Sequence, residues 1–294
     1  MSTPLVTAFA TPTTTSRAMV YRTMGDKHGP ITRLMSPSDL GEQLKPFVFL
    51  DHFEAESSTF GGFGMHPHSG IATLTCMMQG SASYEDSTGK EGLLPEGGVE
   101  WMQAGGGVWH SSSPTSDSSG KTAMRGFQLW VSLPPTLENA VAYSSYLAPE
   151  VIPQVGPARL LLGKYDGAKS EITPPSDMNY LAVKLKAGES WSYQPPAGHS
   201  VAWAALSRGK LSAGDATDAP MAAGEMVVFD QSADGIMFKA LEDAEFVLGS
   251  AVPHAHELVL GRYSVHTSPA ALQQGEATIK QMGVALAAQR RIKT

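Results

Sequence analysis

Three of the nine histidines lie in one segment, at a spacing that could build a metal site. His66 and His68 are two positions apart, with Pro67 between them. In an extended segment the side chains of residues i and i+2 point to the same face, so both imidazoles would enter one space. His110 follows three consecutive glycines, which would allow a neighbouring strand to come close. Three convergent imidazoles suit Fe, Cu, Ni or Zn and leave coordination positions open for a substrate.

Each of these histidines has a plainer interpretation when it is considered alone. A single histidine is more often a surface residue or a hydrogen-bonded core residue, and His-X-His pairs arise by chance. The metal hypothesis therefore depends on the elements around the three residues, which must bring them together.

Those elements are predicted to be short strands. The chain of 294 residues contains 30 glycines and 20 prolines, spread along its length, which is typical of strands joined by turns. Apolar runs bounded by turn residues predict these strands in the first half: 47–51, 71–78, 99–102, 108–111 and 125–133. Further strands are predicted at 180–185, 201–206, 225–230 and 245–249, after a proline-containing crossover at about 134–157.

The end of the chain has a helical pattern over about 269–291. Ser268 followed by Pro269 is a capping residue followed by a favoured first-turn residue. We expect its buried side to consist of Ala270, Leu272, Ile279, Met282 and Leu286. The sequence therefore predicts an all-β protein with two β units and a C-terminal helix.

Composition excludes several classes of function. A formal net charge of -7 and a pI near 5.7 argue against direct binding of nucleic acid through its phosphates. Cys76 is the single cysteine, so no intrachain disulfide can form, and we expect it to be a small buried apolar residue. Residues 1–19 lack the apolar run of a secretory signal and are predicted to be a flexible arm. No stretch has the length of a membrane span, so we expect a cytoplasmic protein with no membrane partner.

The sequence from Pro46 to Pro114 resembles the pirin family, through the motifs PFVFLDHF, HPHSGIATLT, GSASYEDSTGKEG and GGVEWMQAGGGVWHSS. RGFQLWVSLP is similar to the strand that follows in the family. PAGHSVAW and GSAVPHAHELVLGRYSVHTSP look like the family's second half, and the resemblance begins at about residue 18. It implies a bicupin, with two stacked cupin barrels of the double-stranded β-helix or jelly-roll type and a C-terminal helix. We expect the N-terminal cupin domain at 20–150, with the metal site, and the C-terminal one at 151–294, without metal.

The resemblance also implies a ligand set, from which this chain departs. The three histidine ligands correspond to His66, His68 and His110, but the family's fourth ligand, a glutamate, is replaced by Ser112. Two further family residues, a glutamate and a histidine, are replaced by Ala72 and Tyr84. A neutral serine leaves the charge of a divalent ion uncompensated and should weaken its binding. We expect one divalent transition metal, with Fe as the first choice and Cu, Ni or Zn as alternatives.

Other residues near these motifs have structural interpretations that we prefer. We expect Glu85, Asp86 and Glu100 in turns or on the surface rather than as substitute ligands. Phe53, Trp101, Met102 and Trp109 are typical of core packing, and the alternative is a pocket lining for a flat aromatic ligand.

The histidines of the second half, His199, His254 and His256, are expected to be structural. His254 and His256 form another His-X-His pair, but no third histidine is predicted at the equivalent place in that barrel.

Two functions follow from the resemblance. The first is a metal-dependent dioxygenase, similar to quercetin 2,3-dioxygenases, that acts on a flavonol or a related aromatic enol or diol. No catalytic residue is assigned, because Ser112 stands where a glutamate would serve as general base. The alternative is a non-catalytic regulatory or protein-binding module with a degenerate metal site. The partner is accordingly a small aromatic substrate or a protein, and we expect a monomer.

Overall fold

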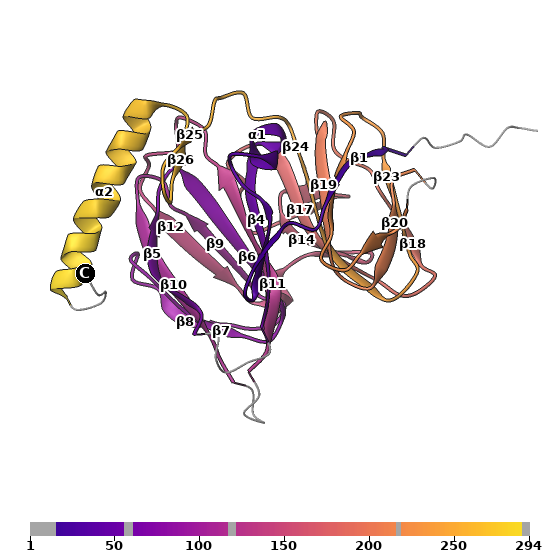
Figure 1. Cartoon of the computed structure of the whole chain (residues 1–294), viewed down its shortest axis with the longest axis horizontal. Helices are drawn as coiled ribbons and strands as arrows, with labels where there is room; N and C mark the ends of the chain where they lie inside the picture. Colours follow the sequence, from indigo (N-terminus) through magenta and orange to yellow (C-terminus); the bar gives the residue numbers. More distant parts are fainter. Residues whose placement is uncertain (1–15, 56–60, 117–121, 216–218, 290–294) are drawn as a thin grey trace, which may run out of the picture.

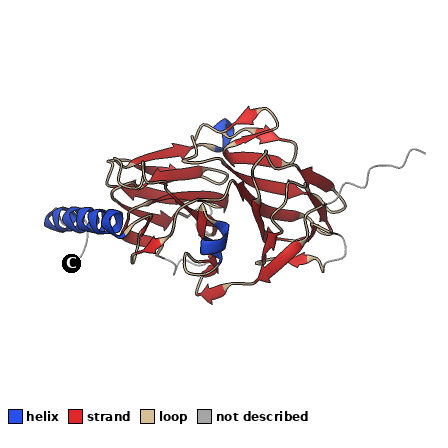
Figure 2. Cartoon of the chain, turned by 90° about the horizontal axis from the view of Figure 1, so that it is seen from above, coloured by secondary structure: helices blue, strands red, loops and turns tan. Residues whose placement is uncertain are grey.

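The computed structural model describes residues 16–55, 61–116, 122–215 and 219–289. Strands dominate it, and they form two barrels that lie beside each other, with one long helix on the outer side of the first (Figure 1). The view from above shows the same two groups of strands and the helix at one end (Figure 2). The prediction of two β units and a C-terminal helix is confirmed.

The first barrel consists of two antiparallel sheets. The larger has the order β12-β9-β6-β11-β4-β3-β2 and the smaller the order β5-β10-β7-β8. The strands of the larger sheet are β2 (Asp26–His28), β3 (Ile31–Met35), β4 (Phe47–Ala55), β6 (Ile71–Gln79), β9 (Val99–Gln103), β11 (Met124–Ser132) and β12 (Tyr143–Leu147). Those of the smaller sheet are β5 (Phe63–His68), β7 (Ala82–Asp86), β8 (Glu91–Leu94) and β10 (Val108–Pro114). A short helix, α1 (Leu40–Leu44), precedes β4.

The second barrel repeats this plan. Its larger sheet comprises, in order, β1 (Met19–Thr23), β22 (Met226–Phe229), β19 (Val201–Arg208), β24 (Ala244–Ala251), β17 (Met178–Leu185), β14 (Ala158–Leu162) and β13 (Gln154–Val155). Its smaller sheet comprises, in order, β18 (Ser190–Tyr193), β23 (Ile236–Ala240), β20 (Lys210–Ala213) and β21 (Met221–Ala222). Outside the barrels lie a 3-10 helix (Pro149–Val151) and two short hairpins, formed by β15 (Lys164–Tyr165) with β16 (Ala168–Lys169) and by β25 (Val259–Leu260) with β26 (Val265–His266).

The two large sheets bury a common apolar core. Phe47 of the first barrel meets Trp203 of the second edge to face, with 5.5 Å between the ring centroids. Trp101 and Tyr180 belong to the same cluster and are fully buried. Burial of aromatic side chains of this size accounts for much of the stabilisation of such an interface.

The N-terminal segment packs on the second barrel rather than on the first barrel, which follows it in the sequence. Strand β1, near the N-terminus, pairs with β22 and so belongs to the second barrel. Arg17 is buried there and donates hydrogen bonds to the carbonyl oxygens of His199, Ser200 and Asp234. Residues 1–15 of the expected N-terminal arm lie outside the described residues. The division at residues 150 and 151 stays a prediction.

Helix α2 (Pro269–Ala288) packs on the first barrel, although it follows the second in the sequence (Figure 1). The side chain of Ser268 accepts a hydrogen bond from the backbone N–H of Ala271, as expected for a cap. Ile279 and Leu286 are buried, whereas the prediction that Ala270 lies on the buried side is wrong. Nine residues at about 100° each place Ala270 on the opposite side of the helix from Ile279. In the described part of the chain, no helix combines the length and the apolar character needed to cross a membrane.

Candidate metal centre

Two neighbouring strands bring the three predicted histidines together. Strands β5 and β10 are antiparallel, with His110 opposite His66 and Val108 opposite His68. The potential ligand atoms of His66, His68 and His110 all lie within 4.8 Å of one another. His68 and His110 are buried and His66 is half-buried, so the group is open mainly on the side of His66.

In each histidine one ring nitrogen is already engaged by an acceptor. Nδ1 of His66 lies 2.6 Å from the carbonyl oxygen of Gly64, and Nδ1 of His68 lies 3.1 Å from that of Tyr263. Nδ1 of His110 lies 3.4 Å from Oε1 of Glu100. Because these oxygens can only accept, the proton of each neutral ring is on Nδ1 and the lone pair is on Nε2.

The remaining nitrogens fit a metal ion. Nε2 of His68 and Nε2 of His110 are buried and have no hydrogen-bond partner among the described residues. A buried hydrogen-bond acceptor without a partner lowers the stability of the folded protein. A metal-binding imidazole has such an unpaired nitrogen until its ion binds. Engagement of the other nitrogen by a carbonyl or carboxylate is the usual arrangement in histidine metal sites.

Burial keeps the rings of His66 and His68 neutral at pH 7. Burial lowers the pKa of His66 to about 4, and the neighbouring His110 adds to the effect. Burial also lowers the pKa of His68 well below its usual value, and His110 and His66 lower it further. Rings that are neutral at pH 7 bind a cation without first releasing a proton.

Glu100 does not lie in a turn or on the surface, contrary to our expectation. It is buried on β9 and accepts a hydrogen bond of 2.7 Å from the hydroxyl of Thr75. Burial would raise the pKa of its carboxyl group, but the contact with His110 and the bond from Thr75 lower it below the usual value. Glu100 therefore touches the outer nitrogen of a candidate ligand rather than replacing a ligand.

Asp86 is buried rather than on the surface, but it does begin a turn, as expected, because its carboxylate accepts a hydrogen bond of 2.7 Å from the backbone N–H of Thr88. It lies at the end of β7 and accepts hydrogen bonds from Ser144 at 2.6 Å and from Tyr146 at 2.9 Å. Tyr146 also donates to Glu100 at 3.4 Å. Asp86 and Glu100 thus share one donor behind His110. The sequence alone does not show whether a single charged residue in a strand is buried inside the barrel.

Ser112 lies two residues after His110 on the same strand and faces the same side by strand alternation. It is opposite Tyr84 of β7 and Phe63 of β5. Ser111 and Ser113 face the other side, where they line a shallow cavity of about 530 Å³. Ala72 is fully buried in the common core. Neither Ser112 nor Ala72 therefore brings a negative charge to the group of three histidines.

The four apolar residues considered as a pocket lining have separate environments. Phe53 packs with Met77 and Met124. Trp101 is part of the core between the barrels, and Met102 belongs to a small cluster with Ala104 and Val108. The ring nitrogen of Trp109 donates a hydrogen bond to the carbonyl oxygen of Ile279 in α2. These contacts agree with core packing, and a role in lining a pocket stays a prediction.

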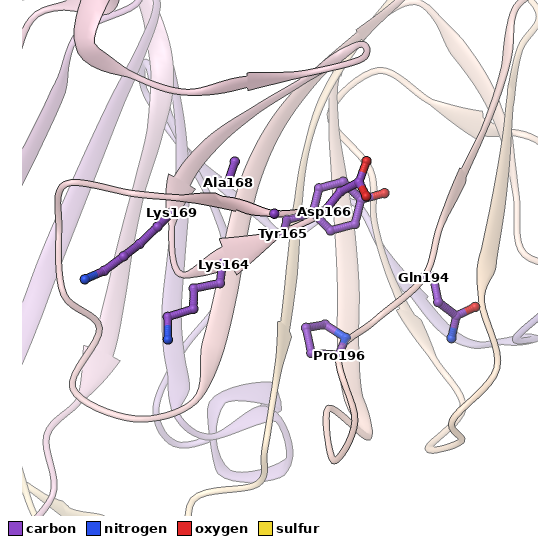
Figure 3. Close-up of a pocket in the computed structure, with 8 residues that line it drawn as sticks. Lys164, Tyr165, Asp166, Ala168, Lys169, Gln194 and Pro196 are labelled. Carbon is purple, nitrogen blue, oxygen red and sulfur yellow. The ribbon is translucent and has the colours of Figure 1, made fainter.

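A cavity of about 600 Å³ lies on the second barrel, apart from the strands that carry the three histidines. It is lined by Lys164, Tyr165, Asp166, Gly167, Ala168, Lys169, Gln194 and Pro196. Figure 3 shows Lys164 and Lys169 extending to one side of the hairpin, away from Tyr165 and Asp166.

The chain is similar to proteins that carry pirin names. The sequence profile described as Pirin matches residues 30–131. A pirin-like protein of Caulobacter vibrioides is 31% identical over 76% of this chain and 81% of its own length. A protein of Pseudomonas aeruginosa named "Putative quercetin 2,3-dioxygenase" is 35% identical over 54% of this chain, and the match spans 59% of that protein.

Solved structures show the same fold. A quercetin 2,3-dioxygenase of Acinetobacter baumannii has a TM-score of 0.77 at 24% identity, with 89% of this chain and 94% of the other covered. A bacterial pirin of Escherichia coli, solved in complex with nickel(II), has a TM-score of 0.61 at 19% identity over 81% and 96% of the two chains. The fold is that of two cupin barrels. With the relation to the Caulobacter protein over most of its length, these findings show that the chain belongs to the pirin family.

Proposed function

We propose that this protein is a metal-dependent dioxygenase for a flavonol or a similar aromatic enol or diol. The observation that carries the proposal is the convergence of three imidazoles whose Nδ1 atoms are all engaged. The names of the relatives agree with it, since two of them are quercetin 2,3-dioxygenase names.

His66, His68 and His110 would hold one divalent transition metal, with Fe as the first choice. Such an ion supplies a Lewis acid and a template that orients an anionic oxygen ligand. The protein would contribute three imidazole donors in fixed orientations and leave the remaining coordination positions open on the side of His66. Fixed donor geometry lowers the entropic cost of bringing two reactants together.

Ser112 restricts the class of substrates that the proposed site can activate. A carboxylate near the ion could remove the proton of a substrate hydroxyl, but a serine hydroxyl cannot do so at neutral pH. Glu100 is not available for this purpose, because its oxygens are engaged by His110, Thr75 and Tyr146. The substrate is therefore one whose hydroxyl is acidic enough to arrive as an anion or to ionise on binding.

The first experiment is elemental analysis of the purified protein beside a His66→Ala, His110→Ala double variant. We expect close to one equivalent of Fe, Cu, Ni or Zn in the native protein and none in the variant. Oxygen uptake is then measured with quercetin and with simple catechols, against a control that contains the free metal alone. Bound metal without uptake above this control would contradict the dioxygenase and leave the metal site intact.

The alternative function is a non-catalytic regulatory module that binds another protein. The observation that favours it is Ser112, because a site without its carboxylate should bind an ion more weakly. A protein that stays free of metal after reconstitution with each of the four metals would support this alternative.

A further inference from the structure

The strands that carry the three histidines are held from outside by the last described part of the chain. After leaving the second barrel, the chain returns to the first, forms the hairpin β25–β26 and continues as α2 (Figure 1). Helix α2 contacts both β5 and β10. A segment nearly 200 residues away in the sequence therefore touches both histidine strands.

At His68 this contact is direct. The carbonyl oxygen of Tyr263 accepts the hydrogen bond from Nδ1 of His68 at 3.1 Å. The next residues fix the position of that carbonyl: the hydroxyl oxygens of Ser69 and Ser264 lie 2.8 Å apart, and the N–H of Val265 donates to the carbonyl oxygen of Ser69 at 3.3 Å. The orientation of a candidate ligand is thus set by a main-chain atom of the C-terminal segment.

A buried polar chain anchors this junction. Nε2 of His266 lies 3.0 Å from the hydroxyl oxygen of Ser69, and its Nδ1 lies 3.2 Å from Oε2 of Glu138. Glu138 also accepts from both the N–H and the hydroxyl of Thr267, at 2.6 and 2.7 Å. All of these groups except Thr267 are buried.

Ser69, His266 and Glu138 have the residue types of a nucleophilic catalytic triad. However, a substrate has no space to approach Ser69. Ser69 is fully buried and Gly275 of α2 faces it. A Cβ atom added to Gly275 would lie 2.6 Å from both Oγ of Ser69 and Nε2 of His266. The series is therefore closed to a substrate, and it holds β26 against the end of β5.

The second contact is beside His110. Trp109, its neighbour on β10, donates from Nε1 to the carbonyl oxygen of Ile279 at 2.9 Å. Gly283 makes this approach possible, because a Cβ atom there would lie 2.8 Å from Cζ2 of Trp109. Gly275 and Gly283 are eight residues apart, which places them about 80° apart around the helix, toward the barrel.

We propose that residues 263–283 are a positioning element of the metal centre. The carbonyl of Tyr263 fixes the Nδ1–H tautomer of His68, and α2 fixes the part of β10 that carries His110. This inference rests on the proposed three-histidine metal site. The groups that orient metal-binding histidines typically change metal affinity about 10- to 100-fold when they are lost.

The test compares Gly275→Val with Ala277→Val in the full-length protein. Both changes place valine in α2, but Gly275 faces Ser69 whereas Ala277 is exposed. Cobalt(II) is the probe, titrated by its visible spectrum into metal-free protein. We expect binding to weaken about 10- to 100-fold in Gly275→Val and to stay within about twofold in Ala277→Val.

A second measurement does not depend on any metal. Long-range proton–nitrogen spectra of the histidine rings report which nitrogen carries the proton. We expect His68 of the metal-free native protein to carry it on Nδ1, and Gly275→Val to give a mixture of both tautomers. Circular dichroism establishes that each variant is folded. If Gly275→Val does not fold, Ser264→Ala replaces it, because this change removes only the hydroxyl contact with Ser69. We expect Ser264→Ala to bind cobalt(II) several-fold more weakly than the native protein.

The two hypotheses fail in different ways. If folded variants keep both the native cobalt affinity and the native His68 tautomer, the positioning role is overturned. If the native protein binds no cobalt(II), the proposed metal site is overturned, and the tautomer comparison alone decides whether the segment orients His68.

Discussion

Oε1 of Glu100 lies 3.4 Å from Nδ1 of His110, and both side chains are buried in the first barrel. Glu100 thereby orients a candidate ligand without being a candidate ligand itself. It also places a negative charge close behind the three imidazoles, where it would partly balance the charge of a bound cation.

We therefore expect Glu100→Gln to weaken metal binding about 10- to 100-fold. The amide keeps the size of the side chain but removes its charge and can present a donor to Nδ1. Isothermal titration with zinc or cobalt measures the change, and Glu91→Gln on the exposed strand β8 is the matched control. Equal affinities for the two variants would show that Glu100 does not act on the metal centre.

Ser112→Glu should strengthen metal binding by at least about tenfold, because it adds an anionic ligand on the face of β10 that carries His110. Ser113→Glu is the control, since Ser113 is exposed on the opposite face. Competition with a chelator of known affinity gives both constants. If the two variants bind equally, the side chain of residue 112 does not reach the metal.

Arg125 and Lys184 pair with the same carboxylate from different environments. Arg125 is buried and donates to Glu245 at 2.7 Å and to the hydroxyl of Ser207 at 2.6 Å. Lys184 lies 3.0 Å from Glu245 but is 60% exposed. We expect Arg125→Met to lower the free energy of unfolding by about 3 kcal/mol.

Lys184→Met should change that free energy by less than about 1 kcal/mol, because an exposed pair is screened by solvent. Urea unfolding of both variants measures the difference. Similar losses in the two variants would mean that the link from Arg125 to the second barrel adds no stability.

His52 makes the stability of the protein depend on pH. It is buried on β4, and its Nε2 lies 3.0 Å from the hydroxyl of Ser207 in the second barrel. Burial lowers its pKa to about 4, and the nearby Arg125 and Arg208 add to the effect against the opposing influence of Glu54. Its contribution to stability is therefore complete above about pH 6.5 and is lost as the pH falls toward 4.

The test is the loss of unfolding free energy between pH 7 and pH 4.5. We expect His52→Gln to lose less than the native protein does, by on the order of 2 kcal/mol, since glutamine does not titrate in this range. The comparison of the two losses removes the effect of the other buried histidines, which both proteins share. Parallel losses would contradict a shifted pKa of His52.

Local sequence patterns were sufficient for the nine expected strands, the final helix and the candidate ligands, but not for strands such as β5, β7 and β12, the last of which lies inside the expected crossover. The apolar run expected at 71–78 is β6 (Ile71–Gln79), and the helix after Ser268 begins at Pro269 as its capping pattern indicates. The His-X-His spacing placed His66 and His68 on one face, because side chains alternate along a strand. Each of these features depends only on residues that are close together in the chain, so each can be predicted from one sequence without a structure.

The residues around the ligands could not be found in this way. Glu100 looked like a surface residue, because the burial of a charge depends on which strands enclose it. Tyr263 gave no signal at all, because its contribution is a carbonyl oxygen, which every residue has.

The sequence by itself determined two β units, a final helix and three histidines able to face one another. The tertiary structure alone decided that β1 joins the second barrel and that the C-terminal segment returns to the first. It also decided that Glu100 and Tyr263 orient two of the histidines. Periodicity reports only on residues a few positions apart, whereas contacts across 195 residues are selected by the total burial and hydrogen bonding of the folded chain.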